Sequence, residues 1–208
     1  GRKVDGVFSI WYGKGPGVDR SGDPLKHINF NGTHPKGGVL VVFGDDHPGK
    51  SSSIGHQSDP ALAANSIPVL FPATIQEFID FGLHGIALSR YASVVVGFKC
   101  VNETVTATST VEIDPDRVSV NIPQGMGNPE GGIHIRPEYD PLGQDVRMVR
   151  HKLPRVLAYA RANRLDKVAF GHPRPTRLGI VTSGKAYLDC IAALHQLGLD
   201  EVKAKEMG

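Results

Sequence analysis

The sequence predicts an α/β fold in which an open parallel sheet is covered by helices. Two observations carry this prediction. Val39–Phe43 is a continuous apolar run and Ser93–Phe98 is nearly so, which is typical of strands buried on both faces of a parallel sheet. Such runs also alternate with segments of helical periodicity from Val7 onward, the order expected when helices connect parallel strands.

The first strand–helix unit contains a glycine-rich segment, Gly13–Asp23. The apolar run Val7–Tyr12 before it predicts a strand, and the spacing of Leu25, Ile28 and Phe30 after it predicts a helix. We expect the segment to form a turn, either a simple connection or a loop that approaches a cofactor closely. Its candidate cofactor-binding residues are Gly13, Lys14, Gly15, Gly17, Asp19 and Arg20.

Three further elements are predicted in the middle of the chain. Asp59 and Pro60 have the types of a cap and a first-turn proline for a short helix ending at Ala64. Ile67–Phe71 predicts a short strand, with Pro68 at an edge or start. Thr74–Glu77 is a capping box that begins a longer helix. The apolar face expected for that helix consists of Ile75, Phe78, Ile79, Leu83 and Ile86.

The composition changes after residue 120, which divides the chain into three parts. Residues 121–145 are rich in glycine and proline and are predicted to be a connector. Asp145 is expected to cap a helix that Pro154 kinks or splits. The apolar positions expected for this helix are Val146, Val149, Leu153, Val156, Leu157 and Ala160. Leu178–Thr182 and the helical pattern behind it predict the first βα unit of a second α/β domain. The expected parts are therefore 1–120, 121–145 and 146–208.

Composition excludes several classes of function. The net charge of +2 comes without a basic stripe, so we expect no nucleic-acid partner. No apolar run reaches about 18 residues, so we expect no membrane span, and no signal-peptide pattern is present. Cys100 and Cys190 stand far apart in apolar surroundings, which predicts buried, reduced thiols in the cytoplasm. Because the chain starts on a strand without Met, we expect a fragment.

Gly44–Ser51 satisfies the pattern of a phosphate-binding P-loop and follows an apolar strand. Pro48 has no N–H to offer a phosphate, and Asp45 and Asp46 would repel one. No helix pattern begins at Lys50. A P-loop NTPase using Lys50 and Ser51 is therefore an alternative rather than the main interpretation.

The polar loop that follows the strand Val39–Phe43 could also bind a metal ion. His47, His56 and the nearby aspartates could surround a metal, but the two histidines lack the spacing of common metal pairs. We therefore predict no metal site, and expect His47, His56 and Ser58 to supply hydrogen bonds at the carboxyl end of the sheet, where such sheets bind ligands. Lys99 either contacts a ligand or reaches solvent.

Several long stretches together resemble the fused, single-chain indolepyruvate ferredoxin oxidoreductases of the 2-oxo acid ferredoxin oxidoreductase family. In order, they are VFSIWYGKGPGVDRSGD (7–23), GGVLVVFGDDHPGKSSSIGHQSD (37–59), IPVLFPATIQEFIDFGLHGIALSRY (67–91) and FKCVNETV (98–105). The later pieces YARANRLDK and RLGIVTSGKAYLD match the run of that family into its next domain.

The resemblance implies a thiamine diphosphate and Mg²⁺ enzyme that oxidatively decarboxylates an aryl 2-oxo acid such as indolepyruvate. It implies electron transfer through iron–sulfur clusters elsewhere in the parent protein to ferredoxin, and release of an acyl-CoA. Residues 1–120 would be most of a pyrimidine-binding domain, and the end of the chain would begin a transketolase-C-terminal-like domain. The implied partners are the other domains of the parent, ferredoxin, coenzyme A and a second copy. The residues implied to face the cofactor are Gly13, Lys14, Gly15, Gly17, Asp19, Arg20, His47, His56 and Ser58.

Three parts of that family pattern are missing. The glutamate that activates the cofactor is expected before Gly1, and the Gly-Asp-Gly motif for diphosphate and Mg²⁺ has only Gly44-Asp45-Asp46 as an imitation. No cysteine cluster is present for iron–sulfur binding. We therefore expect the chain alone to be inactive and to bind thiamine diphosphate weakly or not at all. A non-catalytic structural module remains a further alternative.

Overall fold

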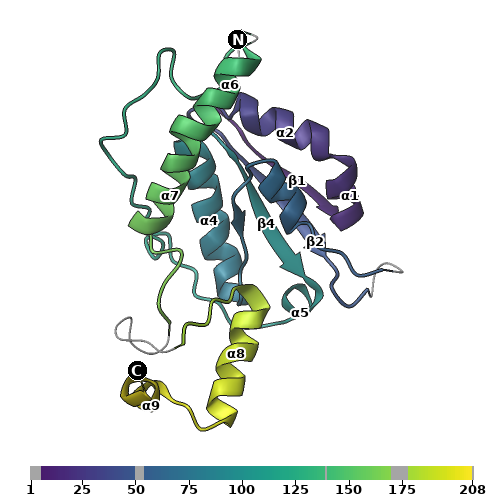
Figure 1. Ribbon diagram of the computed structural model, residues 1–208, viewed down its shortest axis with the longest axis vertical. Helices are drawn as coiled ribbons and strands as arrows, with labels where there is room; N and C mark the ends of the chain where they lie inside the picture. Colours follow the sequence, from purple (N-terminus) through teal and green to yellow (C-terminus); the bar gives the residue numbers. More distant parts are fainter. Residues whose placement is uncertain (1–5, 50–53, 139, 170–177, 208) are drawn as a thin grey trace.

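The computed structural model describes residues 6–49, 54–138, 140–169 and 178–207. Within them, four parallel strands form one open sheet in the order β1-β2-β4-β3 (Figure 1). The strands are β1 (Phe8–Lys14), β2 (Gly38–Asp45), β3 (Val69–Leu70) and β4 (Val95–Val101). The predicted α/β class with a parallel sheet is confirmed, and each strand predicted between Val7 and Phe98 is present.

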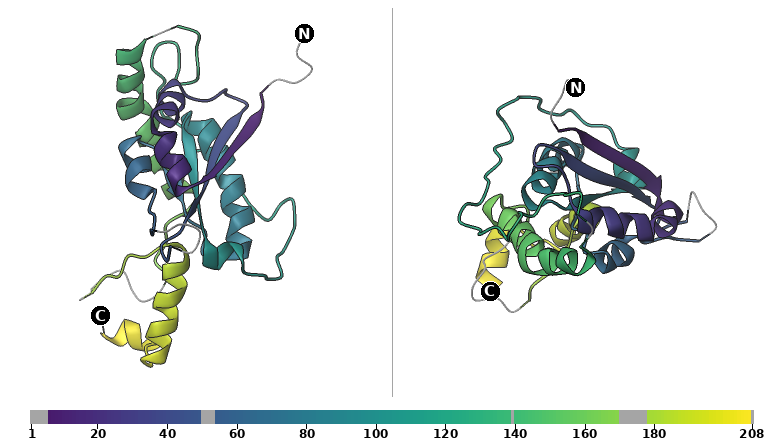
Figure 2. Two further views of the ribbon diagram at one scale, coloured as in Figure 1. Left: turned by 90° about the vertical axis from the view of Figure 1, so that its right-hand side faces the viewer. Right: turned by 90° about the horizontal axis from the view of Figure 1, so that it is seen from above.

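Helices cover both faces of this sheet. Helices α1 (Gly15–Arg20) and α2 (Gly22–Asn31) connect β1 to β2, and α3 (Asp59–Ala64) lies between β2 and β3. Helix α4 (Ile75–Ala92) connects β3 back to β4, in the opposite direction across the sheet. Because crossovers between parallel strands are right-handed, this reversal of direction moves α4 to the other face. Figure 2 shows α4 on the opposite side of the sheet from α1 and α2.

Two buried clusters correspond to the two faces. On the α1–α3 side the buried apolar residues are Val18, Leu25, Val41, Phe43, Leu62, Ile67 and Val95. On the α4 side they are Leu40, Leu70, Leu88, Ala92, Val94, Val96, Phe98, Met148 and Tyr159. Neighbouring residues of β2 and β4 alternate between the clusters, as successive side chains of a strand must. Burial on both faces explains the continuous apolar runs.

The turn predicted at Gly13–Asp23 is wrong, because this segment is divided between a strand and two helices. Strand β1 continues through Lys14, and α1 begins at once with Pro16 in its first turn. Proline suits this place because its fixed φ is helical and its missing N–H has no partner in the first turn anyway. Gly15 and Gly17 are therefore helical, and neither has a positive φ. Ser21 separates α1 from α2.

Helix α4 begins as predicted but buries only part of the predicted face, where Phe78 and Ile86 pack against the core. The Thr74 hydroxyl accepts the Glu77 N–H at 3.2 Å, while the Glu77 carboxylate accepts the Ala73 N–H at 2.7 Å. Ile79 and Leu83, predicted to be in the core, are exposed. The helix instead approaches the sheet at Gly85, where a Cβ would lie 2.7 Å from Leu40 Cδ2. Because glycine has no apolar side chain, the periodicity of apolar residues cannot show that this side of the helix faces the sheet.

The connector is followed by one interrupted helix. After α5 (Asn102–Val105), regular structure resumes with α6 (Pro141–Arg147), the π-helix η1 (Met148–Lys152) and α7 (Leu153–Ala162). The cap is Asp140 rather than the predicted Asp145, since the Asp140 carboxylate accepts the Gly143 N–H at 2.9 Å. The expected irregularity near Pro154 is the π-helical turn immediately before α7, where proline cannot donate a helical hydrogen bond.

This helical segment docks through buried cations. Of its predicted apolar positions, Leu153 and Val156 pack against the cluster on the α4 side, whereas Val146, Val149 and Leu157 are exposed, so the prediction is wrong for these three. Lys152 is fully buried instead, and its Nζ donates to the carbonyl oxygens of Asn29 at 3.2 Å and of Phe30 at 2.9 Å in the last turn of α2. Burial lowers the pKa of Lys152 to about 7.

The last described elements are α8 (Gly184–Gln196) and α9 (Glu201–Met207). The helix predicted after Gly184 is confirmed, but the strand predicted at Leu178–Thr182 is wrong. Residues 178–183 are paired with no strand in the described part of the chain. A β-strand requires a hydrogen-bonding neighbour, which local apolar sequence cannot supply. The division of the chain at residues 120 and 145 stays a prediction.

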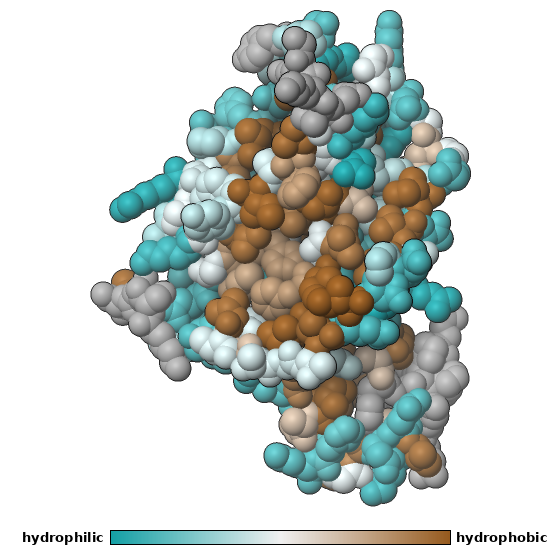
Figure 3. Space-filling model, turned by 180° about the vertical axis from the view of Figure 1, so that it is seen from behind, coloured by the Kyte–Doolittle hydropathy of each residue, from teal (hydrophilic) through white to brown (hydrophobic). Residues whose placement is uncertain are grey.

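Strand β1 leaves an apolar surface uncovered. Phe8, Ile10 and Tyr12 lie on the α4 side of the sheet, and all three are exposed, Tyr12 by 82%. Figure 3 shows apolar side chains gathered in the middle of this face of the molecule. Among the described residues, no strand pairs with the outer edge of β1. Association of two copies stays a prediction.

No helix within the described ranges is both long enough and apolar enough to cross a membrane.

Candidate functional site

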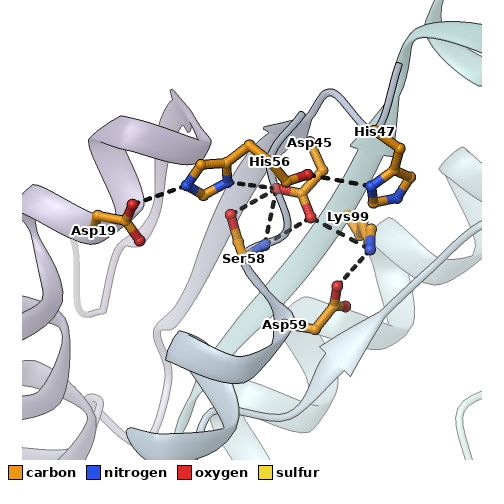
Figure 4. Close-up of polar contacts among 7 residues, drawn as sticks. All are labelled: Asp19, Asp45, His47, His56, Ser58, Asp59 and Lys99. Atoms are coloured by element: carbon orange, nitrogen blue, oxygen red, sulfur yellow. Dashed lines mark hydrogen bonds and ion pairs between the residues drawn. The ribbon is translucent and has the colours of Figure 1, made fainter. Parts of the chain in front are cut away.

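Polar side chains gather at the carboxyl ends of β2 and β4. Asp45 is the last residue of β2, and Lys99 of β4 stands beside Phe43 in the register of the two strands. The loop between Asp46 and Ser58 returns over this edge, and α1 and α3 flank it (Figure 4). We call this group the Asp45 cluster. Its members are Asp19, Asp45, His47, His56, Ser58, Asp59 and Lys99.

The buried Asp45 carboxylate organises the cluster. Its Oδ1 accepts the Ser58 hydroxyl at 2.6 Å, and its Oδ2 accepts the Ser58 backbone N–H at 2.9 Å. Lys99 Nζ lies 3.3 Å from the same Oδ2. Hydrogen bonds and a nearby cation together stabilise a carboxylate that burial alone would destabilise. Ser58 directs its hydroxyl at Asp45, and its predicted place facing a cofactor stays a prediction.

Lys99 is an internal counter-ion rather than a side chain that reaches solvent. It is only 4% exposed, and its Nζ lies 2.5 Å from Asp59 Oδ2 and 4.9 Å from the centre of the Phe71 ring. Asp59, predicted as the cap of α3, is the first residue of that helix and pairs with Lys99 instead. The sequence shows a lysine within an apolar strand run, but the partner of that lysine depends on how β2 and β4 pair.

His56 links the loop to α1. Its Nε2 lies 2.8 Å from Asp19 Oδ2, and its Nδ1 lies 3.5 Å from Asp45 Oδ1. The hydrogen bond with Asp19 raises the pKa of His56 above its ordinary value of 6.5. The ring packs against Gly15 so closely that any Cβ there would overlap it. His47 Nδ1 is 3.2 Å from the His56 carbonyl oxygen, which holds the two ends of the loop together.

The structure brings together only part of the predicted set. Gly15, Asp19, His47, His56 and Ser58 meet in or beside the Asp45 cluster. Gly13 makes room for the Trp11 ring, whose Cη2 would lie 2.7 Å from a Cβ at this position, whereas a Cβ at Gly17 would meet the ring only at an ordinary contact distance of 3.8 Å. Lys14 and Arg20 are exposed and lie outside the contacts drawn in Figure 4.

The His56–Asp19 contact makes a direct prediction about pH. We expect the pKa of His56 in the folded chain to lie above 6.5 and to fall towards that value in Asp19→Asn. Since the raised pKa belongs to the folded state, the contact stabilises folding fully below pH 6.5, and this contribution is lost as pH rises through the folded pKa. Histidine proton shifts followed by NMR across pH give the value. Asp189→Asn, which removes a carboxylate on α8, is the control and should leave His56 unchanged; an equal effect of both substitutions contradicts the assignment.

The described residues do not fit thiamine diphosphate and Mg²⁺ by themselves. Asp45 and Asp59 are committed to Lys99, and no group of three or more His, Cys, Asp or Glu in the described ranges could hold a metal ion. No glutamate belongs to the Asp45 cluster. Cys100 and Cys190 are unpaired and half-buried, and burial raises the pKa of Cys100 to about 11. We therefore derive no reaction step through a cofactor from these residues.

The described part of Gly44–Ser51 does not form a phosphate-binding loop. Lys50 and Ser51 lie outside the described residues. Before them, the Asp46 carbonyl oxygen accepts the N–H groups of Gly49 and His56, at 3.1 Å and 3.0 Å, which closes the loop on itself. The first described helix after this loop begins at Asp59. The described contacts therefore give no support to a nucleotide site, and the P-loop alternative stays a prediction.

Known proteins share sequence with this chain. The family model "Indolepyruvate oxidoreductase domain" matches residues 167–208. Indolepyruvate oxidoreductase subunit IorA of Methanothermobacter marburgensis is 25% identical over 202 residues, which cover 95% of this chain. The resemblance to indolepyruvate oxidoreductases is confirmed.

Two further indolepyruvate oxidoreductase subunits support it. IorA of Pyrococcus abyssi is 26% identical over 209 residues and 92% of this chain, and IorA of Methanothermobacter thermautotrophicus is 26% identical over 204 residues and 95% of it. The chain spans only 29% to 31% of the length of these three relatives. The relatives are named as a subunit, so the fused, single-chain arrangement stays a prediction. No solved structure matches the chain significantly.

Proposed function

We propose that the chain is part of a thiamine diphosphate-dependent 2-oxo acid oxidoreductase. The reaction would convert indolepyruvate, or another aryl 2-oxo acid, to an acyl-CoA with loss of CO₂ and reduction of ferredoxin. The observation that supports this proposal most is the sequence similarity to indolepyruvate oxidoreductase subunits along 92% to 95% of the chain. A second support is the Asp45 cluster at the carboxyl ends of β2 and β4, the edge where open α/β sheets bind ligands.

The proposed contribution of this chain is a pyrimidine-binding-like domain that supports one side of the cofactor site. Asp45, Ser58 and Lys99 satisfy one another, so their role is to hold the loop and α3 in place. The groups of the cluster that could contact a ligand are the exposed His47 and the His56–Asp19 pair. The diphosphate, its Mg²⁺ and the activating glutamate would be held by other parts of the enzyme.

The partners in this proposal follow from length and from chemistry. Relatives about three times as long as the matched region leave room for further domains. Electron transfer from a 2-oxo acid to ferredoxin requires iron–sulfur clusters, and the two cysteines of this chain cannot bind one. We propose that the clusters and the ferredoxin and coenzyme A sites lie in those other parts. We also propose that the enzyme containing this chain forms a homodimer.

The decisive experiment measures reduction of a viologen dye by the enzyme that contains this chain, given indolepyruvate, coenzyme A and thiamine diphosphate. We expect activity that requires thiamine diphosphate and falls by roughly tenfold in His47→Ala, or in Lys14→Ala at the carboxyl end of β1 beside Gly44. His27→Ala and Lys36→Ala, which remove the same types of side chain away from the carboxyl ends of the strands, are the matched controls and should stay near full activity.

Two results would contradict the proposal. One is the absence of activity with any 2-oxo acid in folded, cluster-loaded enzyme. The other is tight, stoichiometric calorimetric binding of thiamine diphosphate to the 208-residue chain alone, which would mean that the described residues suffice for the cofactor. If nucleotide binding appeared instead and was lost in Lys50→Ala, the P-loop alternative would replace it.

A further inference from the structure

Strand β1 stands at one edge of the sheet but has the composition of an interior strand. Its sequence FSIWYGK, with Val7 before it, contains no charged residue until Lys14 at its end. Its apolar residues point to both faces, since Ile10 and Tyr12 lie on the α4 side and Trp11 packs against the cluster on the α1–α3 side. Strands that are apolar on both faces are typical of the covered interior of parallel sheets.

The α4 side of β1 lacks a covering helix in the described part of the chain. Ile10 stands beside Leu40 of β2 in the parallel register, so the two side chains share one face of the sheet. Leu40 is only 5% exposed because α4 packs on it, whereas Ile10 is 53% exposed. Phe8 and Tyr12 are exposed on the same face. A helix beside α4 would bury all three side chains of β1.

The other side of β1 is hollowed. A cavity of about 410 Å³ with mainly apolar walls lies between β1 and α2. Trp11 and Val39 from the sheet, Ile28 from α2 and Ile135 from the connector line it. A strand added at the edge would direct alternate side chains towards this face, because successive side chains of a strand point to opposite faces. The cavity has room for such side chains.

The backbone of β1 is available on its outer side. The strand pairs with β2 from Phe8 to Lys14, and no strand among the described residues pairs with its other edge. An extended segment can add to such an edge through main-chain hydrogen bonds, while pockets beside the edge receive its alternate side chains. Strand β1 offers both features.

We propose that a further β-strand of the longer protein, from outside these 208 residues, pairs with the free edge of β1 and is followed by a helix that packs over Phe8, Ile10 and Tyr12. The chain spans only 29% to 31% of the length of its relatives, which leaves ample sequence for this unit. Helix α4 connects β3 to β4 in the direction of β1. Because such connections are right-handed, one that continues outward beyond β1 places its helix on the same face as α4.

A second copy of the chain fits this edge less well. Two copies of β1 paired antiparallel about a twofold axis would satisfy the backbone of both strands. Their exposed side chains would then form one wider apolar face that still has no helix over it. A strand that brings its own helix covers the edge and the face together. The proposal requires only that the chain is part of a longer protein, and does not depend on the reaction proposed above.

The test is photo-crosslinking in the whole protein that contains this chain, with a photoreactive amino acid in place of Tyr12, which is 82% exposed. Mass spectrometry of the product identifies the segment that lies over β1. We expect a crosslink within one molecule, to a segment outside the 208 residues. The same photoreactive residue in place of Ile113, which is 83% exposed, is the control and should not react with that segment.

The substitution Ile10→Lys, compared in the whole protein and in the 208-residue chain, is an independent measurement. In the chain alone the lysine would meet solvent, so the melting temperature should change by less than about 2 °C. In the whole protein the lysine would be buried beneath the helix, and the melting temperature should fall by roughly 5 °C or more. Ile113→Lys is the matched control and should have little effect in either protein.

Three results would overturn the proposal. The first is a crosslink that joins the β1 strands of two copies, the second is the absence of any crosslink from position 12, and the third is an equal effect of Ile10→Lys in both proteins. None of these measurements involves catalysis. Their outcome is therefore independent of the viologen assay, and either proposal can fail without the other.

Discussion

Replacing Lys99 with methionine is expected to destabilise the folded chain by about 3–5 kcal/mol. The substitution keeps the length of the side chain but removes the cation that lies 3.3 Å from the buried Asp45 carboxylate and 2.5 Å from that of Asp59. Asp45 would then be a buried charge supported by the Ser58 hydrogen bonds and by His56, whose Nδ1 lies 3.5 Å from its Oδ1. Urea denaturation at neutral pH measures the loss as a lower midpoint with an unchanged slope.

The control for this prediction is an ion pair of the same chemistry on the surface. Lys185 Nζ lies 2.6 Å from Asp189 on the exposed side of α8, so Lys185→Met should cost less than about 1 kcal/mol. Asp45→Asn introduced together with Lys99→Met removes the unpaired charge and should recover part of the lost stability. If Lys99→Met costs no more than Lys185→Met, Lys99 does not serve as the internal counter-ion.

Folding stability is expected to rise between about pH 7 and about pH 10 through Lys152. The pKa of this lysine is lowered to about 7 in the folded chain and returns to its ordinary value near 10.5 on unfolding. Between these values the unfolded chain binds a proton that the folded chain does not, so stability increases with pH. Below the folded pKa both states are protonated, and the slope vanishes. The rise amounts to a few kcal/mol at most.

Urea denaturation repeated across this pH range, on the wild type and on Lys152→Met, isolates the effect. Other groups also titrate in the range, so the readout is the difference between the two curves. We expect that difference to grow with pH in favour of the wild type. Lys152→Met is also expected to leave the carbonyl oxygens of Asn29 and Phe30 without their donor. Parallel curves would mean that Lys152 keeps an ordinary pKa in the folded chain.

The strands could be predicted from sequence because burial on both faces leaves a local signal. The apolar runs around Val41 and Val96 carry that signal and lie in the two central strands. The ends of these strands could not be predicted in the same way. Asp45 and Lys99 are tolerated inside the sheet only because β2 and β4 place them together, and strand pairing is not a local property.

The helix faces were predicted less well for a related reason. An apolar pattern identifies a buried face only where apolar contact provides the burial. Helix α4 approaches the sheet through Gly85, and the segment from α6 to α7 docks through Lys152 and Arg155 onto carbonyl oxygens. Whether a cation meets solvent or the end of another helix depends on tertiary structure, so Ile79 and Val149 were placed in the core incorrectly.

The candidate site was predictable as a place but not as a set of contacts. The loop containing His47 and His56 follows a buried strand, and this locates it at the carboxyl edge of the sheet. The pairing of His56 with Asp19 joins residues from two separate segments, and no spacing rule connects them.

The uncovered strand β1 has a consequence for how the chain behaves at high concentration. An edge strand of seven residues with exposed Phe8, Ile10 and Tyr12 offers both backbone hydrogen-bonding groups and apolar side chains to another molecule. Natural sheets usually protect such an edge with charges, prolines or a covering element, because it otherwise promotes aggregation. With a net charge of only +2, repulsion between copies is weak. The solubility of the chain should therefore depend on whether another strand or molecule covers the free edge and the exposed apolar side chains of β1.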